Sequence, residues 1–444
     1  MNKEFHKKQN FFSFSDIDSE RKDRIMKFTS TEATPAPHVP PGVLRLTGAA
    51  KEDIPMYRIQ TMNKISPVGL NRFPSELYEV GDAVQDPQGI LVRSAKLLDL
   101  EFNPGLLAIA RAGVGVNNIP LDRCAAAGIP VFSTPGANAN AVKELVICAM
   151  LMGSRDIPGA IRWVREQAAS GVDVSTVVEK GKSAFIGPEL YKKTLGIIGL
   201  GAIGSIVANT AISLGMDVYG YDPFLSVDTA LRLDRHVHVV KDINDLYKRS
   251  DYITMHIHYT EKTAHMIDAD AIAAMKRGVR VINLARGEIV DDEAMLTALD
   301  TGMVAAYITD FPNNRLLTAP HVIAMPHLGA STPESEQNCA AMAVDTLRDY
   351  LESGNIRSSV NLPEMTMDRS GVQRLCVLHK NVPGMLANIT SLFGRDGVNV
   401  ENLSNKSCGD YAYTMVDLGS KVGDNVIEDV RRTANVIRVR SLEW

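Results

Sequence analysis

The sequence lacks three features that would each indicate a particular class of protein. No apolar run approaches the roughly 20 residues that a membrane-spanning helix needs. The formal net charge of −5 is small for 444 residues and no basic block is present, so neither nucleic acid nor a membrane surface is an expected partner. The five cysteines are odd in number, far apart and without metal-ligand spacing. We therefore expect reduced thiols, no bound metal and a cytoplasmic location.

The remaining composition is that of a globular protein. The chain is 45% hydrophobic and 22% charged, and its length allows about three domains. Residues 1–54 are polar, interrupted by prolines and mixed in charge, unlike a secretory signal or a mitochondrial presequence. We expect this segment to be a disordered extension. Regular structure is expected to begin near Met56, which leaves open whether Met56 is the biological start.

A glycine motif in its full context predicts a dinucleotide site. Gly199-Leu200-Gly201-Ala202-Ile203-Gly204 follows a buried strand pattern at 195–198 and opens an amphipathic stretch, and Asp222 ends the next apolar run. The three glycines permit a tight turn, a close approach to a pyrophosphate and close helix–strand packing. An acidic residue at the ribose favours NAD over NADP. The predicted contacts are Gly199, Gly201, Ala202, Ile203, Gly204 and Asp222.

Alternating strand and helix patterns predict two parallel-sheet units, each of them doubly wound. Residues 55–150 carry strand patterns at 89–93, 106–110 and 129–132. Residues 151–325 carry them at 195–198, 217–221, 252–257, 279–284 and 304–309. A helical pattern at 143–170 leads from the first unit to the second. A helix at 333–353 is expected to pack back on the first unit, so that 326–360 belongs to it and the cofactor domain is an insertion.

The C-terminal part predicts a third, smaller domain. Residues 361–371 have the composition of a linker. Residues 372–444 then show a βαββαβ pattern, with strands at 372–379, 398–406, 411–418 and 435–442 and helices at 383–395 and 424–433. This order is ferredoxin-like. The expected fold class is therefore α/β, with two Rossmann-like parallel-sheet domains and a C-terminal ferredoxin-like domain.

Several separated motifs resemble the D-isomer-specific 2-hydroxyacid dehydrogenases. They are Val92-Arg93-Ser94, Arg111-Ala112-Gly113-Val114-Gly115-Val116, Asn283-Leu284-Ala285-Arg286-Gly287-Glu288-Ile289-Val290-Asp291 and Pro326-His327-Leu328-Gly329-Ala330-Ser331-Thr332. Together with the C-terminal module, which resembles an ACT domain, they are most similar to the branch of the family that oxidises 3-phospho-D-glycerate. The resemblance covers about 56–444. It implies a flavodoxin-like substrate domain, an NAD-binding domain and a regulatory domain.

The resemblance also assigns roles to residues. His327 matches the acid/base that takes the hydroxyl proton while hydride passes from C2 to the nicotinamide, a task for which histidine is suited. Arg286 matches the arginine that binds the substrate carboxylate and polarises the C2 oxygen. The backbone of Val114 and Gly115 is expected to hold the same carboxylate. Further implied cofactor contacts are Ala285, Asp310, His327 and Gly329, and further substrate contacts are Ser94 and, for the phosphate, Arg93, Arg111 and Arg155.

Less specific interpretations of these residues stay open. Arg93, Arg111 and Arg155 could be surface or interdomain arginines. His256 and His258 resemble a metal pair only superficially, because no cysteine or carboxylate stands at ligand spacing, and we interpret them as packing and cofactor-edge residues. His258 also occupies a position where the family often has proline.

One departure from the family concerns the catalytic histidine. In most relatives a glutamate shortly after the segment that begins at Asp310 hydrogen-bonds this ring. Here the segment reads Asp310-Phe311-Pro312-Asn313-Asn314-Arg315, with no carboxylate in the expected place. The chain is then either a working dehydrogenase, in which Asn313 or Asn314 holds the ring, or a weak catalyst retained for binding. The first is preferred, because Arg286, His327 and the cofactor site are all present.

The ACT-like module suggests feedback control. His379, Asn381 and Asn399 match the residues that hold L-serine between paired domains in serine-regulated relatives. The alternative is an assembly domain that binds nothing, since turn chemistry alone favours asparagine and glycine at such positions. The resemblance implies a homodimer or homotetramer, assembled through the cofactor domain and through ACT pairing.

The leading hypothesis is NAD-dependent oxidation of 3-phospho-D-glycerate to 3-phosphohydroxypyruvate, the first step of L-serine biosynthesis, with feedback regulation by L-serine. A possible side activity is the reduction of 2-oxoglutarate. The close rival is another D-2-hydroxyacid dehydrogenase, for which the arginines of a phosphate site would be superfluous. The rival from a different class is a catalytically weak NAD-binding sensor.

Overall fold

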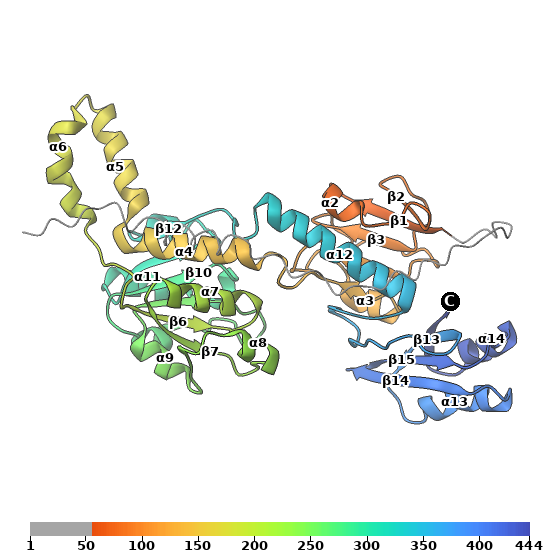
Figure 1. The fold of residues 1–444 in the computed structure, drawn as a ribbon. Coiled ribbons are helices and arrows are strands. Elements are labelled where there is room, and N and C mark those ends of the chain that lie inside the picture. The colour runs from red at the N-terminus through yellow and green to blue at the C-terminus, as the bar shows by residue number, and fades with distance from the viewer. Residues whose placement is uncertain (1–55) are drawn as a thin grey trace, which may run out of the picture. The chain divides into compact units, whose positions relative to one another are not determined.

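The structure, a computed structural model, describes residues 56–444, so the expected disorder of 1–54 lies outside the described residues. Three sheets organise this part of the chain (Figure 1). Two of them are parallel and the third is antiparallel, which confirms the predicted fold class. No helix within 56–444 combines the length and the apolar character that a bilayer crossing requires.

The first sheet has five parallel strands in the order β2-β1-β3-β4-β5. This is the flavodoxin-like order. Successive residues of β3 pack on opposite faces, Leu91 into one hydrophobic cluster and Ile90 and Val92 into another. The elements are β1 (Tyr57–Met62), α2 (Pro67–Leu70), β2 (Tyr78–Gly81), β3 (Gly89–Val92), β4 (Ala108–Arg111), α3 (Leu121–Ala126) and β5 (Val131–Phe132).

Helix α12 (Pro333–Ser353) returns to this first sheet from the far end of the second unit. Its start carries Pro333 in the first turn and Thr332 as N-cap, whose side chain accepts a hydrogen bond from Ser335 N. It ends at Gly354, whose φ of 75° allows the left-handed C-cap. The buried face recurs at helical spacing: Cys339, Ala340, Ala343, Val344, Leu347, Tyr350 and Leu351.

The second sheet has seven parallel strands in the order β12-β11-β10-β9-β6-β7-β8. The order reverses between β6 and β9, which creates the switch point where open α/β sheets bind ligands. Its strands are β6 (Thr194–Ile198), β7 (Asp217–Tyr221), β8 (Val237–Val239), β9 (Tyr252–Met255), β10 (Val279–Asn283), β11 (Val304–Thr309) and β12 (Val322–Ala324). Its helices are α4 (Ala139–Arg155), α7 (Ala202–Ser213), α8 (Val227–Arg232), α9 (Ile243–Arg249), α10 (Ala269–Ala273) and α11 (Asp292–Asp300), with 3-10 turns η2 (Gly287–Ile289) and η3 (Leu316–Thr318).

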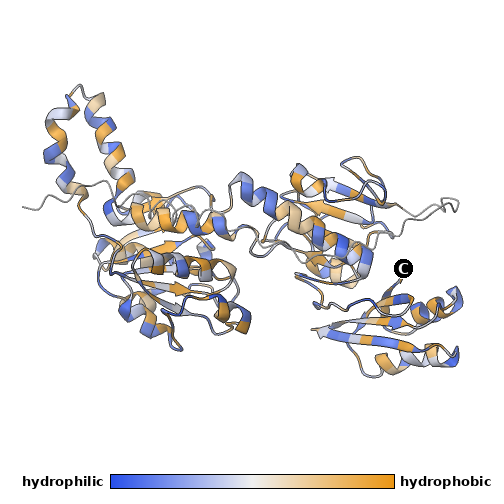
Figure 2. Cartoon of the chain, in the orientation of Figure 1, coloured by the Kyte–Doolittle hydropathy of each residue, from blue (hydrophilic) through white to orange (hydrophobic). Residues whose placement is uncertain are grey.

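The helix expected at 143–170 is two helices, α4 and α5 (Ile157–Ala169). Asp156 separates them with a φ of 40°, and its side chain accepts a hydrogen bond from Gly159 N as the N-cap of α5. Helices α5 and α6 (Val174–Gly181) and the 3-10 turn η1 (Lys182–Phe185) contain no buried residue. Figure 1 shows α5 and α6 as a pair that stands off from the seven-stranded sheet, and Figure 2 shows hydrophobic and hydrophilic residues intermixed along both.

The C-terminal sheet is antiparallel in the order β14-β15-β13-β16 and is covered on one face by α13 and α14. Its elements are β13 (Gln373–Lys380), α13 (Met385–Arg395), β14 (Val400–Cys408), β15 (Tyr411–Leu418), α14 (Asp424–Arg432) and β16 (Val436–Glu443). The other face shares a hydrophobic cluster with α12, to which it contributes Cys376, Leu378, Tyr413, Met415 and Leu442. The segment predicted as a linker is packed into the same cluster by Leu362, Met365 and Met367.

A glycine marks the closest approach between α2 and α12. A Cβ on Gly69 would lie 2.6 Å from the backbone carbon and 2.7 Å from the Cβ of Ala340. We expect Gly69→Ala to lower stability by about 1–3 kcal/mol, because the two helices must separate. Thermal unfolding followed by circular dichroism measures this change.

The control for that substitution is Gly394→Ala. A Cβ on Gly394, in α13, would meet no atom within 4 Å, and alanine is the better helix former. Its unfolding midpoint should be unchanged or raised. A Gly69→Ala protein that unfolds at the wild-type temperature would show that α12 is free to shift away from α2.

Candidate active site

The glycine loop after β6 is built by close backbone contacts. Gly199 has a φ of 90°, and a Cβ there would lie 2.6 Å from His256 O. A Cβ on Gly204 would collide with Gly199 O, so α7 begins directly against the loop. Gly201, the N-cap of α7, has open space where its Cβ would be. The amides at the start of α7, at Ala202 and Ile203, therefore border an open position suited to a phosphate.

Asp222 is held toward this loop at the end of β7. Its Oδ2 accepts a hydrogen bond of 2.9 Å from Leu200 N, and its Oδ1 accepts one of 2.8 Å from Phe224 N. The carboxylate is only half-buried, which leaves lone pairs for a ligand's hydroxyl groups. The glycines and this acid thus fit the adenosine and pyrophosphate of a dinucleotide.

Asp310 lies between the second sheet and the loop after β12. The residue is 1% exposed; Oδ2 accepts a hydrogen bond of 3.1 Å from Gly329 N, and Oδ1 is buried without a partner. Burial raises the pKa of this carboxyl. The free oxygen is suited to an amide donor such as the carboxamide of a nicotinamide. Ala285, another predicted cofactor contact, is buried at the end of β10.

His327 stands at the rim of a pocket of about 760 Å³ that Asp310 also lines. The imidazole is exposed, and its ring centroid lies 4.8 Å from that of Phe311. The remaining pocket walls come from the start of α11 and the loop after β11, among them Asn313 and Arg315. The exposed ring is accessible to a substrate.

Three of the predicted arginines converge from three different strands. A Cβ on Gly115, in the loop after β4, would lie 3.1 Å from a guanidinium nitrogen of Arg286, which follows β10. Arg111 Nε donates a 3.0 Å hydrogen bond to Arg93 O. Burial lowers the pKa of Arg111, and the positive charges of Arg286 and Arg93 lower it further. A cluster of like charges of this kind is stabilised by a bound anion.

Arg93 has a partner inside the protein. Its guanidinium lies 2.6 Å from Glu336 Oε1 in the first turn of α12, and both side chains are about half exposed. The neighbouring Ser94 is positioned through its backbone N–H, which donates to Asn63 Oδ1. The Val114–Gly115 loop lies beside this cluster through the contact of Gly115 with Arg286.

The structure does not bring Arg155 to this cluster. Arg155 is exposed and ends α4. The adjacent Gly153 accepts a hydrogen bond from Arg280, near the amino end of β10, whereas Arg286 follows the carboxyl end of that strand. Arg155 and Arg286 thus belong to opposite edges of the second sheet.

Two residues that the sequence analysis missed lie on a connection that passes close to the glycine loop. Thr134 Oγ1 and Asn138 Oδ1 are buried without a partner, on the connection between β5 and α4. In that connection a Cβ on Gly136 would lie 3.3 Å from the Cβ of Ala202. Asn138 is the N-cap of α4 but makes no capping hydrogen bond. The available signal was a Thr-Pro-Gly turn followed by asparagine directly after a buried strand.

The loop without the family's glutamate is tied to α11 instead. Asn313 Nδ2 donates a 2.7 Å hydrogen bond to Asp292, and Arg315 lies 2.5 Å from Glu293 Oε1. The Oδ1 of Asn313 accepts hydrogen bonds from backbone amides of its own loop. Asn313 therefore does not hold the His327 ring, contrary to one interpretation of the sequence.

The two histidines after β9 differ in environment. His256 Nδ1 is buried without a partner, and Nε2 lies 3.2 Å from Thr254 Oγ1. Burial lowers the pKa of His256 to about 4, so the ring is neutral near pH 7. His258 is exposed. No group of three histidine, cysteine or acidic residues within 56–444 is arranged to hold a metal ion.

The predicted effector residues lie in the C-terminal domain. His379 is 2% exposed and bridges β13 to its own turn and to β15: Nδ1–H donates to Lys380 O at 2.8 Å, and Nε2 lies 2.9 Å from Thr414 Oγ1. Both ring nitrogens are thus used inside the domain. Asn381 Nδ2 donates to Gly409 O, and Asn399 Nδ2 donates to Glu401 Oε1, both near the surface. Only the two asparagines present exposed amides.

Comparison with known proteins agrees with this geometry. Residues 147–329 match the D-isomer-specific 2-hydroxyacid dehydrogenase NAD binding domain. A D-3-phosphoglycerate dehydrogenase of Synechocystis sp. is 36% identical over 71% of this chain and 56% of its own length. One of Escherichia coli K12 is 33% identical over 76% of this chain and 82% of its own. The NAD+-bound 3-phosphoglycerate dehydrogenase of Entamoeba histolytica superposes with a TM-score of 0.54 at 26% identity, over 70% of this chain and 99% of that one.

The matched lengths differ between relatives. The chain spans little more than half of the Synechocystis protein but most of the E. coli protein.

The position of Asp222 generates a prediction about cofactor affinity. We expect Asp222→Ala to weaken NADH binding about tenfold, or 1.4 kcal/mol, and to reduce the preference over NADPH, because the ribose loses an acceptor and the 2'-phosphate loses a repelling charge. Titration by NADH fluorescence measures both affinities. Asp228→Ala, at an exposed position in α8, removes the same charge without touching the loop. Equal effects of the two substitutions would contradict a specific role for Asp222.

Proposed function

The chain belongs to the D-isomer-specific 2-hydroxyacid dehydrogenase family, and on that premise we propose that it is an NAD-dependent enzyme that oxidises 3-phospho-D-glycerate to 3-phosphohydroxypyruvate, the first step of L-serine biosynthesis. The observation that carries the proposal is the convergence of Arg93, Arg111 and Arg286 at the carboxyl edges of the two sheets. The names of the relatives support the same substrate.

Each residue has a defined task in this reaction. NAD, when bound, accepts the hydride from C2. Arg286 binds the substrate carboxylate with a two-pronged guanidinium and polarises the C2 oxygen. The exposed imidazole of His327 takes the C2 hydroxyl proton. Asp310, with one unpartnered oxygen, orients the nicotinamide by accepting from its carboxamide.

The charge of the site favours a phosphorylated substrate. Among the ion pairs of the described residues, Arg93 is the one arginine of this cluster that has a carboxylate partner, Glu336, and the positive charges of Arg93 and Arg286 both act on Arg111. A simple 2-hydroxyacid brings one negative charge, which Arg286 alone can match. The phosphate of 3-phospho-D-glycerate brings further negative charge, and Arg93 and Arg111 then have a ligand.

A specific observation favours the second candidate function, an NAD-binding sensor. His327 is exposed, and the loop that would carry its orienting glutamate is tied to α11 through Asn313 and Arg315. A sensor needs the cofactor site but not an oriented base. The other dehydrogenase rival differs only in its substrate, so one experiment separates all three.

The test is NAD reduction with 3-phospho-D-glycerate and with unphosphorylated D-glycerate, from pH 7 to 9.5. We expect turnover of the phosphorylated acid with the higher kcat/KM, and more NADH formed at the higher pH, because oxidation of the hydroxyl releases a proton. Arg93→Met should raise KM for 3-phospho-D-glycerate about tenfold and leave KM for D-glycerate little changed. Arg155→Met, outside the cluster, should leave both values unchanged.

Other outcomes would select the rivals. A higher kcat/KM for an unphosphorylated acid would indicate another member of the family. NAD binding without turnover of any 2-hydroxyacid would favour the sensor. An effect of Arg155→Met as large as that of Arg93→Met would mean that Arg155 reaches the phosphate from a second subunit.

Feedback inhibition by L-serine is part of the proposal. The polar contacts would come from Asn381 and Asn399, because both ring nitrogens of His379 are engaged within the domain. We expect calorimetric titration to detect L-serine binding to the full chain, and Asn381→Ala to weaken it about tenfold. Asn388→Ala, exposed on α13, serves as the control. Absence of heat with the wild-type protein would favour the assembly-domain alternative.

We also propose that the chain is a homodimer or homotetramer. Helices α5 and α6 bury no residue, yet they carry exposed apolar side chains that include Ile161, Val164 and Val178. Ile186, shortly after them, is 82% exposed. Apolar surface of this kind is typical of contacts between subunits.

A further inference from the structure

The C-terminal end of α12 is held by side chains from outside the helix. The last carbonyls of any helix lack intrahelical partners and must be satisfied in another way. Here three residues of the C-terminal sheet and one of the preceding segment donate to five successive carbonyls. The bonds are Arg440 to Tyr350 O (3.0 Å) and Leu351 O (2.8 Å), Arg369 to Glu352 O (2.9 Å), Arg374 to Ser353 O (2.8 Å) and Tyr413 to Gly354 O (2.7 Å).

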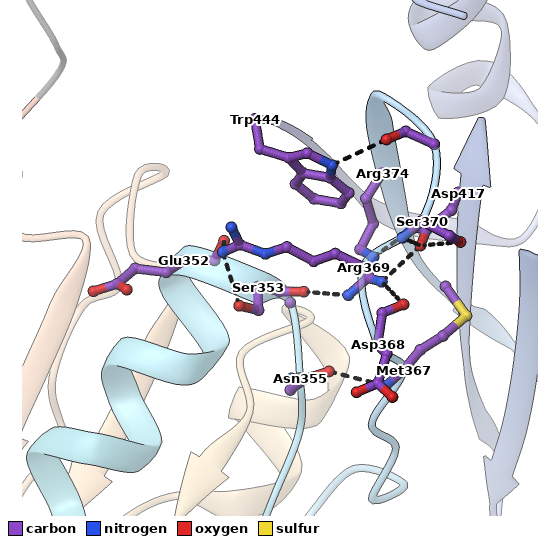
Figure 3. A network of polar contacts seen from close by, with 12 residues as sticks. Glu352, Ser353, Asn355, Met367, Asp368, Arg369, Ser370, Arg374, Asp417 and Trp444 are labelled. Atoms are coloured by element: carbon purple, nitrogen blue, oxygen red, sulfur yellow. Dashed lines mark hydrogen bonds and ion pairs between the residues drawn. The ribbon is translucent and has the colours of Figure 1, made fainter. Parts of the chain in front are cut away.

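Two of these donors belong to a local network shown in Figure 3. Arg374 makes a two-pronged ion pair with Asp417 inside the C-terminal domain, with distances of 2.6 and 2.8 Å and no exposure of either side chain. Arg369 lies over the ring of Trp444, at 4.9 Å from its centroid. The charge of Arg374 is thus balanced without α12, so its contact with Ser353 is an addition to an existing pair.

Arg440 differs because its partners are on α12. Both of its hydrogen bonds go to helix carbonyls, and its guanidinium lies 4.5 Å from the centroid of the Tyr350 ring. The residue is 9% exposed, and none of the ion pairs found within 56–444 includes it. A buried cation is costly without a partner, and the negative end of a helix dipole is a favourable one. Arg440 therefore strongly favours one position of the helix end.

The opposite end of α12 enters the substrate site. Glu336, in the first turn, holds the guanidinium of Arg93 at 2.6 Å, and the carbonyl of Arg93 accepts the hydrogen bond of Arg111. The chain between His327 and the N-cap Thr332 is only four residues long. At 1.5 Å per residue, the 14–15 residues from Glu336 to the carbonyls of Tyr350 and Leu351 span about 22 Å, so α12 links two polar contacts about that far apart.

The middle of α12 is held by apolar contacts and by polar contacts to the first unit. Arg72 makes a two-pronged pair with Asp345 at 2.6 and 2.7 Å, and its carbonyl accepts a 2.8 Å hydrogen bond from Arg348. Tyr57, in β1, donates to Leu351 O at 2.9 Å.

Leu347 packs near Gly89, and Val344 and Tyr350 lie in the cluster on the first sheet. Apolar burial is non-directional, so it resists a small axial shift or rotation less than hydrogen bonds at the helix end do. The polar contacts at the C-terminal end and those to Arg72 together restrain the axial position of the helix.

We propose that Arg440, in the C-terminal domain, is a positioning residue for the substrate site. Together with Arg72, it restrains α12 and so contributes to the position of Glu336, and through Glu336 to that of Arg93. An event that moves β16, such as occupation or pairing of the C-terminal domain, is thereby transmitted to the phosphate-binding arginines through α12. The proposal deepens the proposed function and rests on it for its kinetic consequence.

The experiment compares Arg440→Met, Arg440→Lys and Lys421→Met in the full chain. Lys421→Met is the matched control, because Lys421 forms an exposed pair with Glu443 in the same domain. For Arg440→Met we expect KM for 3-phospho-D-glycerate to rise about fivefold, kcat to stay within about twofold and NADH affinity to be unchanged. Arg440→Lys keeps the charge and should restore part of the affinity. Lys421→Met should match the wild type.

A second measurement does not depend on turnover. Hydrogen exchange of the peptide covering 331–340, at the far end of α12, should be faster in Arg440→Met than in the wild type and Lys421→Met. Unchanged exchange there, or an unchanged KM in folded Arg440→Met, would overturn the proposal. If Arg440→Met does not fold, the same two readouts on Arg440→Lys decide. A wild-type protein that does not turn over 3-phospho-D-glycerate would refute the proposed function, and the exchange comparison would still decide the role of Arg440.

Discussion

Parallel strands end at the same edge of their sheet, and the candidate active site depends on this constraint. Every strand of the first two sheets runs in one direction, so the loops after β3, β4, β6, β7, β10 and β11 emerge at the carboxyl edges. Arg93 and Arg286 are far apart in the sequence, yet the positive charge of each lowers the pKa of Arg111. The reversal of strand order between β6 and β9 opens the place where a dinucleotide can lie. The residues of the candidate site are therefore brought together by the parallel strand topology and not by proximity in the sequence.

The sequence predicted the central elements better than the peripheral ones. The bounds of β7 and β11 agree with the prediction. β11 is almost wholly buried, whereas β7 alternates between buried and more exposed residues. The strands β2, β8 and β12 were missed, because each lies at the edge of a sheet, is short and is only partly buried. The break between α4 and α5 was missed as well, although the sequence carries signals for it: Asp156 caps α5 and a proline stands in the first turn of that helix.

In the candidate site, residues that belong to a sequence motif were predicted, whereas residues distinguished only by their surroundings in the fold were not. Gly199, Gly204 and Asp222 were predictable because each satisfies a backbone or charge requirement that leaves a signature in the sequence. Thr134 and Asn138 were not predictable, because what distinguishes them is a buried polar atom without a hydrogen-bond partner. Neither the burial of an atom nor the absence of its partner can be read from the sequence. The packing of 361–371 into the core of the first unit was equally hidden by its linker-like composition.

Because the expected glutamate is absent, other groups must orient the ring of His327. The polar side chains of Asn313 and Arg315, in the loop after β11, bind residues of α11, and the ring of Phe311 packs against the imidazole in a tilted arrangement. An aromatic neighbour restricts where the ring lies but supplies no acceptor to fix which nitrogen carries the proton. The remaining restraint is the short chain from His327 to Thr332, which caps α12. In the proposed function, the position of the base is therefore linked to the helix whose Glu336 pairs with Arg93, so we expect a shift of α12 to change proton transfer and phosphate binding together.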